Sequence, residues 1–253
     1  TDYSGKAATE IVSAAILGAS TLDKELVRVY TNLKGKFNIP IMTGTYGIAE
    51  KTCETADTGS ATLSYKKLDL KSAYTQVDIC YADLIATYES ETMKAGTYND
   101  SAPLAGIENW LKEDIIKKTQ LAIDKTIWRG SAASGAVFTD PIIGLFPAAV
   151  AGGAVELLAV SLTVANIITE LDRVVAAIPQ EVYEEVKLFI TPAIARLYAM
   201  ALPNENPYMF DITKAGSLFF RGIEMVVVHL PAGKMLAARP VDLIVGTDLK
   251  DDF

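Results

Sequence analysis

The sequence predicts an α+β fold, and three features of its hydrophobic pattern lead to this prediction. An uninterrupted helical pattern runs from Ile107 to Gly130. Before it, between residues 63 and 79, apolar side chains recur at mostly two-residue spacing, which is typical of half-exposed strands. After it, helical and strand patterns alternate from Thr163 to Val245. A strand-rich part, a long helix and a mixed part in one chain are characteristic of the α+β class.

The chain is expected to begin with an arm, residues 1–20, followed by a helix. Thr21 is a suitable N-cap, Asp23 and Glu25 would favour the first turn, and Gly35 would end the helix. The apolar face of this predicted helix consists of Leu22, Leu26, Val29 and Leu33.

A pair of long strands is predicted next. Ile39 to Ile41 begins an extended segment, a polar stretch follows from Thr43 to Ser60, and the two-residue alternation then runs to Ile79. An isolated hairpin is marginally stable in water, so its apolar side needs a second surface. Either the body of the domain or a neighbouring subunit must supply that surface. The charged residues on the outer face are Lys66, Lys67, Asp69 and Lys71.

The helix from Ile107 to Gly130 would be roughly 36 Å long at 1.5 Å per residue, enough to span a small domain. Trp110 and Trp128 mark its ends. Trp128 beside Arg129 suits either the core of the chain or a surface where a partner docks, and the sequence leaves both readings open. The predicted buried face consists of Ile107, Leu111, Ile115, Ala122, Ile123, Thr126 and Ile127.

The second half is expected to form a separate lobe, entered through Asp140 to Leu145. Thr163 would cap a helix that ends at Pro179, and Thr191-Pro192 would open another that runs to Leu202. A turn at Pro231-Ala232-Gly233 would separate two of the strands. Strands are predicted at residues 187–190, 222–228, 234–238 and 241–245.

Composition excludes several classes of function. The formal net charge is −8, and no basic stripe is present, so a dedicated nucleic-acid binder is not expected. The longest uncharged run, Pro141 to Val155, is shorter than the roughly 20 apolar residues of a membrane span. Cys53 and Cys80 show no CxxC spacing, so neither a disulfide framework nor a zinc site is predicted, and both are expected to be reduced thiols.

The sequence predicts no catalytic, cofactor-binding or metal site. His229 is the single histidine of the sequence, and we interpret it as an ordinary residue at the end of a strand. Residues 130–135 have the glycine spacing of a phosphate loop, but Ala136 and Val137 replace the required Lys and Ser or Thr. The chain is therefore not expected to be an enzyme, although a soluble α+β enzyme using carboxylates and Mg²⁺ stays open as an alternative.

Several stretches resemble one known family when they are taken in order. They are KKLDLKSAYTQVDICYADLI (66–85), the long helix with its terminal glycine (107–130), PIIGL (141–145), FITP (189–192), FRGIEMVV (220–227) and DLIVGTDL (242–249). In this order they resemble the major capsid protein of tailed bacteriophages, the Hong Kong 97-like fold. Family members usually carry further C-terminal strands, and the lack of a scaffolding region would fit a cleaved or trimmed subunit.

The resemblance implies a peripheral domain braced by a spine helix, an axial α/β domain, an extended hairpin loop and an N-terminal arm. The implied parts are the arm and first helix (1–38), the extended loop (39–72), the peripheral domain (73–135), the axial domain (136–240) and a return toward the peripheral domain (241–253).

The function implied is structural: pentamers and hexamers of this chain would form an icosahedral shell around double-stranded DNA, assembled in the host cytoplasm. Scaffold, portal or decoration proteins are further partners that the family allows, with no sequence-specific nucleic-acid binding and no membrane. An encapsulin shell, which encloses a cargo enzyme, is the nearest alternative. The expected subunit contacts are Lys66, Lys67, Asp69, Lys71, Trp128 and Arg129.

Overall fold

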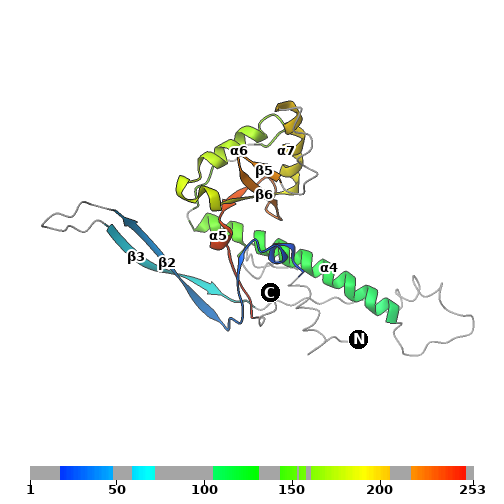
Figure 1. Cartoon of the computed structure of the whole chain (residues 1–253). Coiled ribbons are helices and arrows are strands. Elements are labelled where there is room, and N and C mark those ends of the chain that lie inside the picture. Colours follow the sequence, from blue (N-terminus) through cyan, green and yellow to red (C-terminus); the bar gives the residue numbers. More distant parts are fainter. Residues whose placement is uncertain are drawn as a thin grey trace, which may run out of the picture.

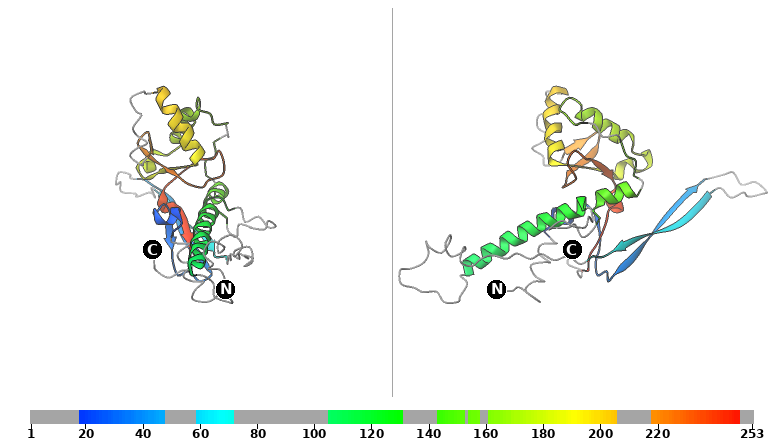
Figure 2. Two further views of the ribbon diagram at one scale, coloured as in Figure 1. Left: turned by 90° about the vertical axis from the view of Figure 1, so that its right-hand side faces the viewer. Right: turned by 180° about the vertical axis from the view of Figure 1, so that it is seen from behind.

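The computed structural model describes residues 18–47, 59–71, 105–130, 143–152, 154–157, 161–205 and 218–248. These residues form a mixed α+β structure with helices and three separate sheets, which confirms the predicted class. A long helix, α4 (Ala105–Arg129), and a two-stranded hairpin point to opposite sides of the molecule (Figure 1). A lobe of helices and strands, which we call the upper lobe, lies above the place where the helix and the hairpin meet. Seen from the side, the described elements are narrow (Figure 2).

The N-terminal helix is far shorter than predicted. Helix α2 covers only Ser20–Asp23, and the positive φ of Glu25 (50°) breaks it. Residues that were expected to continue the helix instead form strand β1 (Arg28–Tyr30), which pairs in parallel with β8 (Ile244–Gly246). The prediction was wrong because Val27, Val29 and Tyr30 favour a strand once a partner strand is present.

The predicted strand pair is confirmed, with different ends. Strand β2 (Lys36–Tyr46) pairs antiparallel with β3 (Gly59–Asp69), from Lys36 opposite Asp69 to Tyr46 opposite Gly59. The first strand begins before Ile39 and continues through part of the stretch that the sequence left as polar. Residues 72–79, the last part of the predicted alternation, lie outside the described residues.

Helix α4 confirms the predicted long helix, but its buried face differs from the prediction. Ile127 is buried and Ile123 half-buried, as expected, whereas Ala122 is exposed. Asp124 and Trp128 are buried near the C-terminal end. The buried side chains among the described residues of α4 lie near this end. The elements that pack against its last turns, and not its apolar periodicity, therefore decide which face is buried.

Helix α4 is followed by α5 (Leu145–Ala151), which the sequence did not predict. The two are joined by a close backbone contact, in which the N–H of Gly144 donates to the carbonyl of Gly130 at 2.6 Å. A Cβ atom at position 144 would lie 2.5 Å from the nitrogen of Gly130 and 2.8 Å from that of Arg129. Glycine is therefore required by space at this position.

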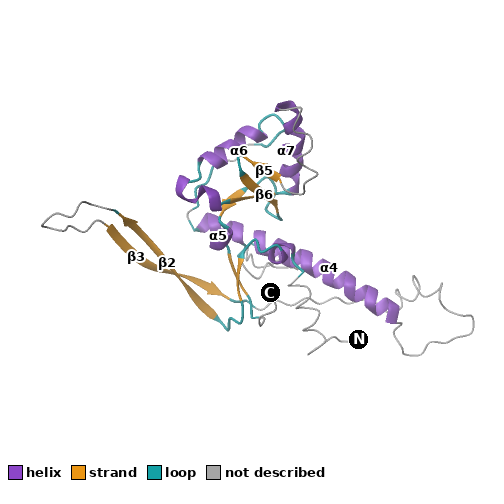
Figure 3. Cartoon of the chain, in the orientation of Figure 1, coloured by secondary structure: helices purple, strands orange, loops and turns teal. Residues whose placement is uncertain are grey.

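The upper lobe contains a four-stranded sheet in the order β5-β6-β4-β7, of which β5 and β6 are labelled in Figure 3. Strand β4 (Lys187–Ile190) pairs in parallel with β6 (Ile223–Val227) and antiparallel with β7 (Leu236–Ala238). These three strands were predicted approximately, whereas the edge strand β5 (Leu218–Phe220) was not. Short 3₁₀ turns at Gln180–Glu185 and Pro240–Asp242 precede β4 and β8.

Helices α6 (Ile167–Ala176) and α7 (Pro192–Glu205) pack on one face of this sheet. The predicted start of α7 is confirmed, because the Thr191 hydroxyl accepts the N–H of Ile194 at 3.4 Å. Helix α6 begins later than predicted. The N–H of Thr163 donates to Asn166 Oδ1 at 2.7 Å, which forms a turn ahead of the helix.

The described residues form two hydrophobic cores. The first lies within the upper lobe, between the two helices and one face of the sheet, and includes Leu171, Leu188 and Ile194. The second lies against the other face of the sheet, where Phe189 and Val226 meet residues of α2 and the end of α4. The second core joins the upper lobe (α6, α7 and the four-stranded sheet) to the lower body (α2, β1, α4 and β8).

Candidate subunit-contact surface

The root of the hairpin is firmly anchored. The ring of Phe37 at its base lies 5.7 Å from that of Tyr30 on β1. On the opposite strand, Leu68 packs so closely over Gly246 of β8 that a Cβ atom there would lie 2.5 Å from Leu68 Cδ2. The β1–β8 pair thus fixes the direction in which the hairpin leaves the body.

Beyond its root, one face of the hairpin is apolar and exposed. In the strand register Pro40 lies opposite Tyr65, and Met42 lies opposite Leu63. Met42 is 67% exposed, Tyr65 63% and Leu63 55%. Adjacent cross-strand pairs of this size would normally be covered. We call Pro40, Met42, Leu63 and Tyr65 the apolar hairpin face.

The opposite face of the hairpin becomes polar toward the tip. Thr43 lies opposite Thr62, and Ile41 opposite Ser64. The Thr43 hydroxyl donates to the carbonyl of Thr62 at 3.4 Å, and the Ser64 hydroxyl donates to the carbonyl of Ile41 at 3.2 Å. The hydroxyl groups of Thr43 and Ser64 therefore have partners on the hairpin itself, and the two faces are chemically distinct.

The four charged residues predicted as subunit contacts lie toward the root of β3 and just after it. The Lys71 ammonium pairs with the Asp69 carboxylate at 3.2 Å within the same chain. Lys66 Nζ lies beside the C-terminal end of α5, 3.2 Å from the place a Cβ of Gly152 would take. Lys67, opposite Asn38, is exposed. Contact of these residues with a neighbouring subunit stays a prediction.

Trp128 lies in the chain's own core. It is fully buried, and its ring centroid is 4.8 Å from that of Phe189. The sequence left open whether Trp128 packs in the core of its own chain or against a partner, and its burial places it in the core. Trp128 is therefore no longer a subunit-contact candidate, because its side chain offers no surface to a second chain. The adjacent Arg129 is exposed and stays a candidate.

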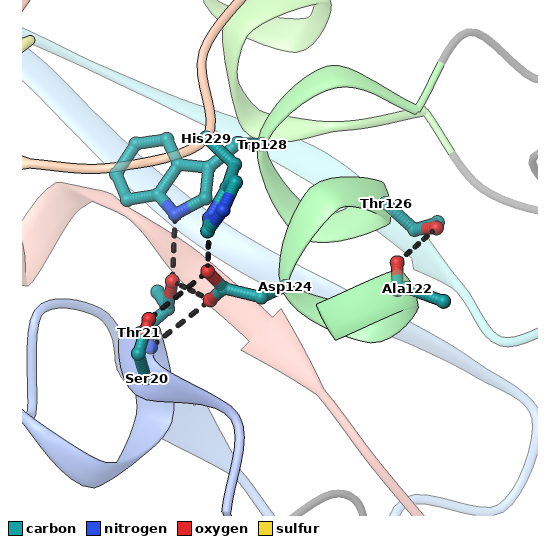
Figure 4. Close-up of polar contacts among 7 residues, drawn as sticks. All are labelled: Ser20, Thr21, Ala122, Asp124, Thr126, Trp128 and His229. Atoms are coloured by element: carbon teal, nitrogen blue, oxygen red, sulfur yellow. Dashed lines mark hydrogen bonds and ion pairs between the residues drawn. The ribbon is translucent and has the colours of Figure 1, made fainter. Parts of the chain in front are cut away.

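A buried polar cluster, which the sequence did not predict, surrounds Asp124 (Figure 4). The Oδ1 atom of Asp124 accepts the backbone N–H of Thr21 at 3.0 Å and also the Thr21 hydroxyl. The Oδ2 atom accepts the Ser20 hydroxyl at 3.0 Å and lies 2.6 Å from His229 Nδ1. The indole N–H of Trp128 donates to the Thr21 hydroxyl oxygen at 2.7 Å.

This cluster satisfies the buried carboxylate. An ionised carboxylate offers about four acceptor positions, and here each oxygen has two partners. The Ser20 hydroxyl donates to the carboxylate and not to the His229 ring, so the pairing of hydroxyl and imidazole that activates a nucleophile is not formed by this serine. An acid within the apolar stripe of α4 was the one signal in the sequence for this cluster.

Other polar groups of the described residues serve the upper lobe. Burial raises the pKa of the Tyr198 hydroxyl, which donates to the carbonyl of Phe219 at 3.0 Å, and the nearby charge of Arg221 opposes that rise. The carboxylates of Asp242 and Glu185 raise the pKa of Arg239. Among the described residues no group of three or more His, Cys, Asp or Glu side chains is placed to hold a metal ion.

No family model matches this chain, and neither does any curated protein or solved structure.

Proposed function

We propose that this chain is a structural protein that self-assembles into a closed shell, with the Hong Kong 97-like subunit architecture that its sequence resembles. Pentamers and hexamers of the chain would form an icosahedral capsid around double-stranded DNA. In such a shell, every copy of the chain would cover exposed surface on its neighbours.

The observation that carries the proposal is the exposed apolar hairpin face. Two strands of 11 residues each project from the body, and only their root is packed. Their large apolar side chains Met42, Leu63 and Tyr65 stay mostly accessible within the single chain. An isolated two-stranded hairpin is marginally stable, so a surface on another copy is the natural support.

The arrangement of the remaining elements is compatible with such a subunit. Helix α4 spans one side of a narrow body, and the hairpin extends from the other (Figure 2). No helix in the described part of the chain has the length and hydropathy that crossing a membrane requires. The net charge of −8 fits an inner wall that must not hold packed DNA tightly. A soluble enzyme would instead be expected as a compact monomer.

The first experiment is electron microscopy of the purified, concentrated protein in negative stain. The proposal predicts closed particles tens of nanometres across, roughly ten times the size of one subunit. Persistent monomers at high concentration would reject it. The contents of the particles separate the two shell types, because a capsid would hold DNA and an encapsulin a cargo protein.

A pair of matched variants tests the hairpin itself. Met42→Glu with Leu63→Lys places an ion pair on the apolar hairpin face, and Thr43→Glu with Thr62→Lys places the same pair on the opposite face, one residue along. We expect the first variant to block assembly while its circular dichroism stays that of the parent. The second should assemble. Equal assembly by both variants would remove the apolar hairpin face from the proposal.

A further inference from the structure

The Asp124 cluster connects three segments that are far apart in the sequence. Ser20 and Thr21 come from α2, Asp124 and Trp128 from the end of α4, and His229 follows strand β6 of the upper lobe (Figure 4). The histidine is attached to the upper lobe, because the N–H of the preceding Val228 donates to the carbonyl of Ile190 on β4 at 2.9 Å. The bond between His229 and Asp124 therefore crosses from the upper lobe to the lower body.

The partners of Asp124 differ in how easily they can separate from its carboxylate. Ser20 and Thr21 belong to the lower body, as Asp124 does, so their bonds to the carboxylate persist when the upper lobe moves. The His229 side chain is 35% accessible, whereas that of Asp124 is 3% accessible. Water can therefore replace the carboxylate as a partner of the imidazole. The carboxylate keeps three donors, so opening does not leave a bare buried charge.

The apolar contact next to the cluster has a different character. Trp128 and Phe189 are fully buried and join the same two parts of the molecule. Burial of apolar surface is non-directional, so it depends less on the exact orientation of the two parts than a hydrogen bond does. A hydrogen bond weakens steeply when its angle changes, so the bond to His229 favours one orientation of the upper lobe.

We propose that the contact of His229 with Asp124 is a releasable latch that sets the orientation of the upper lobe on the lower body. When it opens, the upper lobe turns about the Trp128–Phe189 contact while both parts stay folded. This inference goes beyond the shell function and does not depend on it. In a shell, it would give one chain two shapes.

Pulsed electron spin resonance of the full chain tests the latch. Spin labels at the exposed positions Ala122 on α4 and Ala193 on α7 report the distance between the two parts. A second pair, Ala193 with Glu181, reports a distance within the upper lobe. Cys53 and Cys80 are first replaced by serine. The labelled chains are diluted with unlabelled ones, so that only distances within one chain contribute.

We expect His229→Ala to broaden the distance between lobes, with the population of the open orientation rising by at least roughly tenfold, the effect of losing one hydrogen bond to a charged group. The distance within the lobe should stay unchanged. His229→Asn should restore the narrow distribution, because its amide nitrogen can take the position of Nδ1.

Two results would overturn the latch. One is an unchanged distance between lobes in His229→Ala, which would mean that packing alone fixes the orientation. The other is broadening of the distance within the upper lobe in the same variant, which would make His229 a part of that lobe's stability and not a latch. Failure of His229→Asn to restore the parent distribution would count against the hydrogen bond as the cause.

Discussion

The indole ring of Trp128 lies against the phenyl ring of Phe189, with centroids 4.8 Å apart and planes tilted by 43°. The first residue lies one position before the end of the long helix α4, and the second lies within strand β4. Both residues are fully buried members of the core that joins the upper lobe to the lower body. The stability of the joint should therefore depend on these two rings.

Phe189→Ala is expected to lower the free energy of unfolding by about 3–5 kcal/mol, because it removes a fully buried ring and leaves a cavity. Urea unfolding followed by tryptophan fluorescence measures the change. Phe219→Ala is the matched control in the same sheet. Phe219 is 49% exposed, so its loss should cost less than about 1 kcal/mol. Similar losses for both variants would contradict the assigned core.

Asp124→Asn is expected to cost about 3–5 kcal/mol, because a buried charged cluster loses its centre. The amide of asparagine has one acceptor oxygen and a donor nitrogen, so half of the groups that now donate to Asp124 would face another donor. Asp172→Asn makes the same change at the exposed pair of Asp172 with Arg221, where a cost below about 1 kcal/mol is expected. Chemical denaturation of the two variants gives the comparison directly.

Gly144→Ala is expected to lower the free energy of unfolding by about 1–3 kcal/mol, because the new methyl group would overlap the backbone at the end of α4. Gly35→Ala separates this cause from backbone strain. Gly35 has open space around it but a φ of 94°, so its replacement should cost about 1 kcal/mol. Thermal unfolding of both should rank Gly144→Ala as the more damaging, and the reverse order would refute the steric explanation.

The elements that local pattern decides were predictable from the sequence. The long helix, the strand at 187–190 and the helix opened by Thr191-Pro192 rest on periodicity and capping residues, and the structure has all three. The helix predicted from Thr21 failed because residues 28–30 pair with residues 244–246, more than two hundred positions away. Local propensity contains no information about such a partner.

The candidate sites show the same limit. The hairpin was predictable because the alternation of apolar and polar residues along a strand is a local pattern. Its charged residues belong to the same pattern and were predicted with it. An apolar side that needs a second surface was predicted, but the contribution of Pro40 and Met42 to it was not, since the register that brings Met42 opposite Leu63 follows from the pairing of two strands separated in sequence. The Asp124 cluster needs three distant segments, so His229 could only be read as an unremarkable strand end.

Alkaline pH should reveal the burial of Tyr198. Its pKa is raised above the ordinary value of about 10 because burial disfavours the phenolate. Below about pH 10, the tyrosine is protonated in both folded and unfolded chains, and its contribution to stability is complete. Above that pH, the unfolded chain loses the proton first, so the free energy of unfolding falls until the folded group ionises as well.

Comparison of the parent with Tyr198→Phe isolates this effect from the other tyrosines. At about pH 8 the parent should be more stable by about 0.5–1.5 kcal/mol, because the phenol donates to the carbonyl of Phe219. Denaturant unfolding repeated at about pH 11 should show a smaller difference in the free energy of unfolding. At that pH, loss of the phenol proton favours the unfolded state of the parent, whereas phenylalanine has no proton to lose. A difference that stays constant between the two pH values would mean that the Tyr198 hydroxyl ionises as easily in the folded chain as in the unfolded one.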